Sequence, residues 1–183
     1  MPYLRVVFIV FLVFYGNLYA ANRPIPASPK IGAKHFFLVD YHSGRVLAER
    51  NADEQIAPAS ITKLMTAFVV FNELLNGNIS LNEEVNVSEQ AWRTSGSRMF
   101  VEVGTKVTVE QLLKGMIIQS GNDASVALAE HVAGGEDTFA QFMNQYAKEL
   151  GMTNTHFMNA TGLHHDDHFS TARDIATLTR NLI

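Results

Sequence analysis

The chain has 183 residues, of which 47% are hydrophobic and 17% are charged. This balance is too apolar for a disordered chain and too mixed for a bundle of membrane helices, so it predicts one globular domain. The net charge of −4 does not favour nucleic-acid binding, and the absence of cysteine excludes disulfides, thiol nucleophiles and thiolate metal sites.

The first twenty residues differ in composition from the rest of the chain. Arg5 precedes an uninterrupted apolar run over residues 6–15, and the small residues Ala20 and Ala21 follow. This order is typical of a cleaved secretory signal peptide, and the run is shorter than the roughly 20 residues that a membrane span needs. We therefore expect residues 1–20 to be a signal peptide, with an uncleaved membrane anchor as the alternative.

A short arm and a hairpin are expected next. Residues 21–32 contain three prolines, which favour an extended arm. Two strand-like runs at residues 35–39 and 45–49 flank a turn that contains Gly44, which predicts a β-hairpin. A hairpin of this size is marginally stable alone, so it needs further strands or a helix to pack against.

Apolar residues recur at helical spacing from Ser60 onward. The predicted helices span residues 60–75, 109–118, 124–132, 136–150 and 170–183, the last with Ser170 or Thr171 as its N-cap. Residues 80–109 are expected to form loops and short strands, and residues 157–169 a polar loop. The pattern therefore predicts a mainly helical domain that also contains strands.

Ser60 and Lys63 form a Ser-x-x-Lys pair at the start of the first predicted helix. Residues three apart share a helix face, so the hydroxyl and the amine can lie side by side. A serine becomes a good nucleophile when a base removes its proton, and a lysine can be that base if burial lowers its pKa. The alternative is structural: Ser60 would cap the helix and Lys63 would lie on the surface.

Ser120 and Asn122 lie in a Ser-Gly-Asn segment between two predicted helices. They supply a second hydroxyl and an amide that can reach into a cleft. The structural alternative is that Asn122 or Asp123 caps a helix beginning at Ala124.

These two segments resemble the motifs of a known family. Residues 58–66 (PASITKLMT) resemble the nucleophile motif of the low-molecular-mass penicillin-binding D-alanyl-D-alanine carboxypeptidases, and residues 117–124 (IIQSGNDA) resemble their second motif. Residues 159–163 and 169–174 are similar to later landmarks of the same family. The resemblance runs from about residue 33 to residue 183 in one order.

The resemblance implies a fold as well as an activity. Residues 33–183 would form part of a catalytic domain of the α+β, β-lactamase/transpeptidase-like type, in which a helical cluster packs against an antiparallel sheet. The family acts on peptidoglycan stem peptides ending in D-Ala-D-Ala, is acylated by β-lactams and needs no cofactor or nucleic acid. It works in the periplasm or at the outer face of the cytoplasmic membrane, in some cases attached through a C-terminal segment.

The resemblance also assigns roles to four residues. Ser60 would attack the carbonyl between the two D-alanines, and Lys63 would accept its proton. Ser120 would pass a proton to the leaving amine, and Asn122 would position Lys63 and the substrate amide. Water would then hydrolyse the acyl-enzyme.

The sequence departs from the family in one respect, since it contains no Lys-Thr-Gly. In the family this tripeptide lies on a later strand that binds the substrate carboxylate and completes the oxyanion hole. We therefore expect the chain to be a portion of a longer protein, without the C-terminal strands of the sheet.

Other features of the sequence allow other functions. Residues 164–168 (HHDDH) could bind a metal ion, although contiguous ligands rarely converge on one ion. Trp92, with Arg93 and Arg98 nearby, could form part of a substrate rim or be an ordinary half-buried aromatic residue. A related β-lactamase and a non-catalytic wall-binding or penicillin-binding module are the remaining alternatives.

The absence of Lys-Thr-Gly should make this chain a slow enzyme. A purified protein of the mature length that ends at Ile183 should release D-alanine from a pentapeptide at least about 100-fold more slowly than a complete family enzyme, because it lacks an oxyanion donor. A coupled D-alanine assay measures this rate. Release at a normal enzymatic rate would contradict the prediction.

Overall fold

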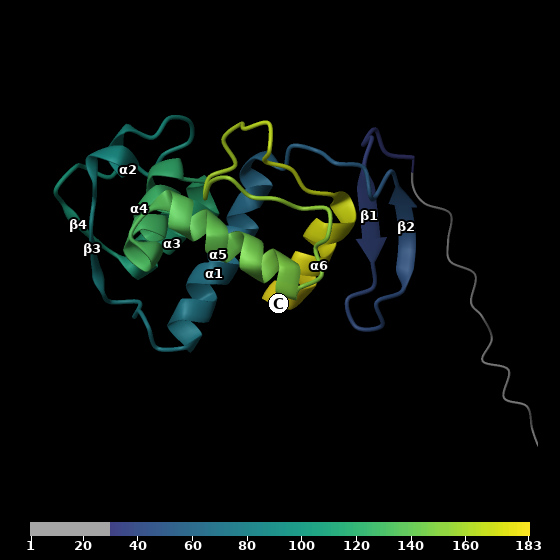
Figure 1. Ribbon diagram of the computed structural model, residues 1–183, viewed down its shortest axis with the longest axis horizontal. Helices are drawn as coiled ribbons and strands as arrows, with labels where there is room; N and C mark the ends of the chain where they lie inside the picture. The colour runs from purple at the N-terminus through teal and green to yellow at the C-terminus, as the bar shows by residue number, and fades with distance from the viewer. Residues whose placement is uncertain (1–29) are drawn as a thin grey trace, which may run out of the picture.

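The computed structural model describes residues 30–183, and Figure 1 shows their arrangement. The expected signal peptide at residues 1–20, and most of the expected arm at residues 21–32, lie outside the described residues. Within residues 30–183, no helix combines the length and the apolar character that crossing a bilayer requires.

Two small antiparallel sheets lie at opposite ends of a helical cluster (Figure 1). The first pairs β1 (Phe36–Val39) with β2 (Val46–Arg50), which confirms the predicted hairpin. The second pairs β3 (Glu84–Asn86) with β4 (Lys106–Thr108) inside the segment expected to hold short strands.

The helices follow the predicted order. They are α1 (Lys63–Leu75), α2 (Glu89–Arg93), α3 (Val109–Gln119), α4 (Asn122–Ala133), α5 (Glu136–Glu149) and α6 (Ala172–Leu182). From α3 onward, the predicted boundaries agree with the observed ones within two residues. The short α2 was not predicted, although Ser88 marks its start by accepting a hydrogen bond from the Ala91 backbone N–H.

The start of the first helix differs from the prediction. Ala59–Thr62 forms a one-turn 3-10 helix, η1, and α1 begins only at Lys63. Pro58 precedes the turn and Ala59 has a positive φ of 47°, so the chain enters the turn in a conformation that cannot continue a regular α-helix.

The hydrophobic core surrounds α1, which packs against α3, α4, α5 and α6. Its largest fully buried side chains are Met65, Val69, Val70, Val109, Leu112, Met116, Val126, Leu128, Phe139, Met143, Phe157 and Leu178. Each large apolar side chain contributes about 1.5–3 kcal/mol when fully buried. The helical cluster therefore forms a rigid base on which α1 can hold buried polar groups.

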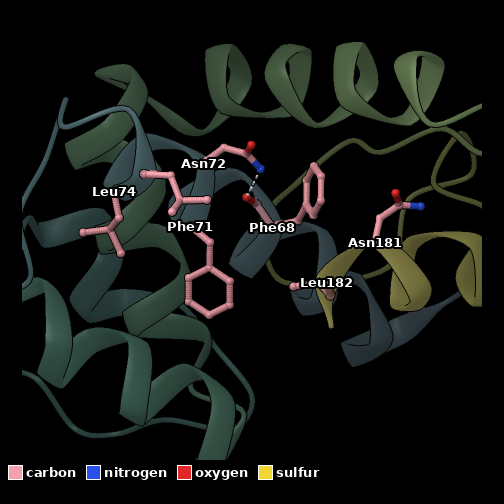
Figure 2. A pocket seen from close by; sticks show the side chains of 7 residues that line it. Phe68, Phe71, Asn72, Leu74, Asn181 and Leu182 are labelled. Carbon is pink, nitrogen blue, oxygen red and sulfur yellow. Dashed lines mark hydrogen bonds between the residues drawn. The ribbon is translucent and has the colours of Figure 1, made fainter. Parts of the chain in front are cut away.

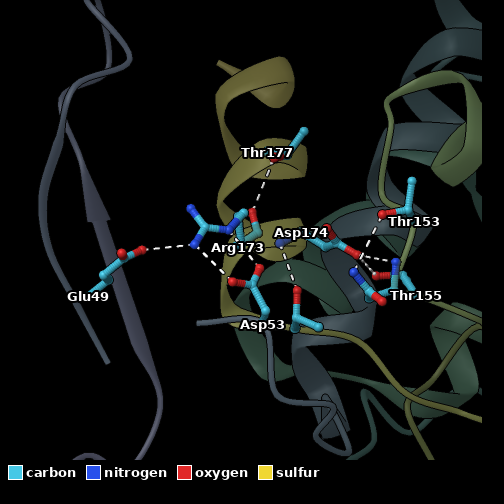
Figure 3. A network of polar contacts seen from close by, with 9 residues as sticks. Glu49, Asp53, Thr153, Thr155, Arg173, Asp174 and Thr177 are labelled. Carbon is cyan, nitrogen blue, oxygen red and sulfur yellow. Dashed lines mark hydrogen bonds and ion pairs between the residues drawn. The ribbon is translucent and has the colours of Figure 1, made fainter. Parts of the chain in front are cut away.

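Arg173 connects the hairpin to the helical cluster, as Figure 3 shows. From the first turn of α6, its guanidinium donates to Asp53, with Nε–Oδ1 at 2.7 Å, and to Glu49, with Nη2–Oε2 at 2.9 Å. The same group lies 4.5 Å from the centre of the Phe37 ring. Helix α6 thus supplies the packing that the isolated hairpin lacks.

On the other side of α6, Asp174 connects the helix to residues 154 and 155 (Figure 3). Its buried carboxylate accepts hydrogen bonds from the Asn154 backbone N–H at 2.9 Å and from Thr155 Oγ1 at 2.7 Å. Thr171 caps the helix by accepting from the Asp174 N–H, which confirms one of the two predicted caps.

Asp174→Ala should therefore lower the free energy of unfolding by about 1–3 kcal/mol, because two donors lose their acceptor in a buried site. Urea denaturation followed by circular dichroism measures the change. The matched control is Asp166→Ala, whose side chain is 97% exposed. Equal stability losses in the two variants would contradict the assignment.

Candidate active site

Ser60 and Lys63 lie at the junction of η1 and α1. Ser60 is exposed in the 3-10 turn, whereas Lys63, the first residue of α1, is only 7% exposed. The distance between Lys63 Nζ and Ser60 Oγ is 3.4 Å. The structure thus brings together the predicted pair, with the hydroxyl facing solvent and the amine buried behind it.

The Lys63 amine has two further partners, both of which only accept hydrogen bonds. Nζ lies 2.7 Å from Asn122 Oδ1 and 2.7 Å from the Thr161 carbonyl oxygen. Among residues 30–183 no carboxylate forms an ion pair with it, and burial lowers the pKa of Lys63 to about 8. When the amine is neutral, two N–H groups satisfy these two acceptors, and its lone pair is left to face the Ser60 hydroxyl.

Asn122 is held so that its oxygen faces Lys63. Its side-chain Nδ2 donates to the Ser95 carbonyl at 2.6 Å, and its backbone N–H donates to the Ser97 carbonyl at 2.7 Å. Gly96 lies between them with a φ of +91°, and a Cβ at that position would lie 2.6 Å from Nδ2. A side chain at position 96 would therefore displace the amide.

The structural alternative for Asn122 and Asp123 is wrong. Helix α4 starts at Asn122 itself, after Gly121, and has no side-chain cap. Asp123 is fully buried, and its carboxylate accepts from the backbone N–H groups of Met99 and Phe100 at 2.9 and 2.8 Å. It holds the neighbouring loop in place, which is a long-range contact that sequence spacing does not reveal.

Ser120 lines the same cavity as Ser60 and Lys63, which has a volume of about 490 Å³. It ends α3 in the left-handed conformation, with a φ of 57°, which is uncommon for a residue that has a Cβ. The rest of the lining is apolar and comprises Ile61, Leu64, Ala67, Phe71, Met116, Ile117 and Leu182. The structure therefore brings all four predicted site residues to one place.

A second, apolar hollow of about 490 Å³ adjoins this cavity, with which it shares Phe71 and Leu182. Figure 2 shows Phe68, Phe71 and Leu182 around it, with the Asn181 amide at its edge. One side of α1 thus remains open to solvent next to the site.

Residues 159–162 complete the site, and sequence reasoning identified them only as a landmark. Asn159 Oδ1 accepts from the backbone N–H groups of Thr161 and Gly162 and from the Thr161 hydroxyl, which turns the Thr161 carbonyl toward Lys63. A Cβ on Gly162 would lie 1.8 Å from the Ala59 carbonyl oxygen, so only glycine fits there. The Asn-x-Thr-Gly pattern was the signal that could have revealed this turn.

The remaining candidates do not join the site as ligands or rim residues. Within the described part of the chain no group of three metal-ligating side chains converges, and His168 turns inward, away from residues 164–167. Trp92 is 39% exposed, and Arg98 donates to its carbonyl oxygen. Neither of these two residues lines the cavity that contains Ser60.

Comparison with known proteins gives one consistent family. Residues 22–183 match the family model described as D-alanyl-D-alanine carboxypeptidase. The chain is 47% identical over 177 residues to D-alanyl-D-alanine carboxypeptidase DacC of Escherichia coli, covering 93% of this chain and 44% of that protein. It is 44% identical to DacF of Bacillus subtilis, covering 82% and 39%.

A solved structure gives the same result. D-alanyl-D-alanine carboxypeptidase DacD of Francisella tularensis superposes with a TM-score of 0.83 and 42% identity, over 92% of this chain and 42% of that one. These similarities confirm the predicted β-lactamase/transpeptidase-like fold of mixed helix and sheet. The chain spans less than half the length of the curated relatives named here.

The geometry at Lys63 predicts its titration. Since burial lowers its pKa from 10.5 to about 8, about half of the amine should be neutral at pH 8 and about one-tenth at pH 7. An NMR titration of ¹³C-labelled lysine side chains measures this, and Lys63→Met assigns the signal by its loss. Asn122→Asp should raise the pKa, because a carboxylate beside Nζ favours the charged amine. A Lys63 signal unaffected by Asn122→Asp would contradict the geometry.

Proposed function

The chain belongs to the D-alanyl-D-alanine carboxypeptidase family, and we propose that it carries the nucleophile and proton-transfer groups of a serine enzyme that removes the terminal D-alanine from peptidoglycan stem peptides. One observation carries the proposal: the buried Lys63 amine, which pairs with no carboxylate of residues 30–183, lies 3.4 Å from the hydroxyl of the exposed Ser60. The pair joins a base whose neutral form is accessible near pH 8 to a solvent-facing nucleophile.

The first step forms an acyl-enzyme. Ser60 Oγ attacks the carbonyl carbon of the bond between the two D-alanines, while its proton moves to the lone pair of Lys63 Nζ. The C–N bond then breaks as the leaving amine takes a proton from the Ser120 hydroxyl, which regains one from Lys63. Ser120 lines the same cavity, which supports this role.

The second step releases the shortened peptide. Water attacks the ester carbonyl and gives a proton to Lys63, and the C–O bond to Ser60 breaks as Oγ recovers that proton. Lys63 returns to its neutral form, so one base serves both steps. Asn122 and the Thr161 carbonyl support this cycle because they hold Nζ in place in either protonation state.

We also propose that the reaction takes place outside the cytoplasmic membrane, where peptidoglycan is found. The sequence of residues 1–20, with its basic start, apolar run and small residues, supports export. A β-lactam presents a strained amide at the same carbonyl position, so we also propose that it acylates Ser60.

Capture of benzylpenicillin tests the proposal. The product of the intact gene, with any residues that flank this chain, should gain the mass of one penicillin, and Ser60→Ala should abolish that gain. Lys63→Ala should slow it at least about 100-fold, because the attacking hydroxyl loses its base. The control is Ser97→Ala, an exposed serine whose contact with Asn122 uses only its backbone, and it should change the rate by less than about threefold.

Three outcomes would count against the proposal. Labelling that persists in Ser60→Ala would show that the nucleophile lies elsewhere. Rapid release of hydrolysed penicillin would favour a β-lactamase, and an unlabelled wild-type protein would favour a non-catalytic module.

A further inference from the structure

His168 is the buried member of the His-rich segment. It is 4% exposed, and both of its ring nitrogens have partners: Nε2 lies 2.9 Å from Thr62 Oγ1, and Nδ1 lies 3.2 Å from the Met158 backbone nitrogen. Because a backbone N–H can only donate, Nδ1 must accept. The proton of the neutral ring is therefore on Nε2, which donates to Thr62.

Thr62 lies inside the turn that contains the nucleophile. It stands between Ser60 and Lys63 in the sequence, and its side chain is fully buried. Its hydroxyl lies 2.9 Å from His168 Nε2, and Thr62 does not line the cavity that contains Ser60. The turn begins at Ala59, which has a φ of 47°, a backbone conformation that residues with a Cβ adopt at a cost. Such a conformation persists when contacts around it fix it from several directions.

The segment 159–168 supplies three of these contacts. Gly162 packs against the Ala59 carbonyl, the Thr161 carbonyl accepts from Lys63, and His168 donates to Thr62. The first two involve the backbone of the segment, whereas the third depends on the identity of one side chain. Substituting His168 therefore removes one contact with the turn at residues 59–62, the hydrogen bond to Thr62, and leaves the two backbone contacts in place.

The surroundings of His168 keep it neutral. Burial lowers the pKa of His168 to about 4, and the nearby titratable groups His156 and His165 act in the same direction. In the turn that contains Ser60, its hydrogen-bond partner is the uncharged Thr62 hydroxyl, and the centre of the Phe157 ring lies 5.7 Å from the centre of the imidazole in an edge-on arrangement. The imidazole therefore stays neutral in the pH range in which Lys63 titrates, and a neutral ring can accept one hydrogen bond and donate another.

We propose that His168 is a positioning residue: through Thr62, it sets the place of Lys63 Nζ against Ser60 Oγ. The effect of this positioning on catalysis rests on the function proposed above. The contact itself can be tested without catalysis, so the two proposals can fail separately.

The tautomer of His168 provides the first test and needs no variant. In the full chain, ¹⁵N NMR of the imidazoles should show His168 with Nδ1 unprotonated and Nε2 protonated from about pH 5.5 to about pH 8. The opposite tautomer, or a doubly protonated ring in this range, would overturn the proposal.

The pKa of Lys63 provides the second test, because it reports the placement of the amine. His168→Ala and Thr62→Val should each raise it above about 8, since a displaced Nζ regains contact with water. His168→Gln and Thr62→Ser, which keep a hydrogen bond between the two positions, should leave it near the wild-type value. If His168→Ala does not fold, Thr62→Val supplies the same measurement.

The control is His131→Ala, which removes a half-buried imidazole that lies 3.2 Å from Glu83, at the far end of α4 from Asn122. It should leave the Lys63 pKa unchanged. The proposal is overturned if His131→Ala moves that pKa as much as His168→Ala does, or if neither His168→Ala nor Thr62→Val moves it.

Penicillin capture by the product of the intact gene links the contact to reactivity. His168→Ala should slow capture at least about tenfold at pH 8, and His168→Gln should stay within about threefold of wild type. Normal capture by His168→Ala would overturn the positioning role. A shifted Lys63 pKa together with an unlabelled wild-type protein would instead support the positioning contact and contradict the proposed function.

Discussion

The Lys63 amine is buried, and its partners in the described part of the chain are uncharged oxygen atoms rather than a carboxylate. Water stabilises the ammonium form of a lysine, and removing that water from Lys63 lowers its pKa to about 8. A change of this size corresponds to about 3 kcal/mol of free energy at neutral pH. This cost is fully present below pH 8 and is relieved as the pH rises toward 10.5, because the folded form then loses its proton before the unfolded form does.

The packing of the helical core offsets the free-energy cost of burying Lys63. Segments distant in the sequence orient its amine. Helix α1 packs against apolar side chains of the other helices. This packing fixes the position of Lys63, the first residue of α1. Asn122 and the Thr161 carbonyl, from segments about 60 and 100 residues away, accept two of the hydrogen bonds of Nζ. Ser95 fixes the Asn122 side chain, and Asn159 fixes the turn that carries the Thr161 carbonyl. The third hydrogen-bonding position of the amine therefore points toward Ser60 Oγ.

The sequence predicted what depends on local periodicity and spacing. The apolar repeats gave the long helices, and the separation of three residues placed the Ser60 hydroxyl near the Lys63 amine. It did not predict contacts made by backbone atoms or by residues far along the chain. The Thr161 carbonyl, the loop held by Asp123 and the inward turn of His168 are of this kind, since no local pattern distinguishes them from a solvated loop. The 3-10 turn at Ser60 was missed because its apolar spacing also fits an α-helix.

If the neutral Lys63 amine removes the proton of Ser60, the rate of acylation must follow the titration of Lys63. The rate of penicillin capture by the product of the intact gene should rise with pH and reach half of its maximum near pH 8, at the pKa measured for Lys63 in the same protein. A capture rate that is independent of pH on both sides of that value would contradict the claim.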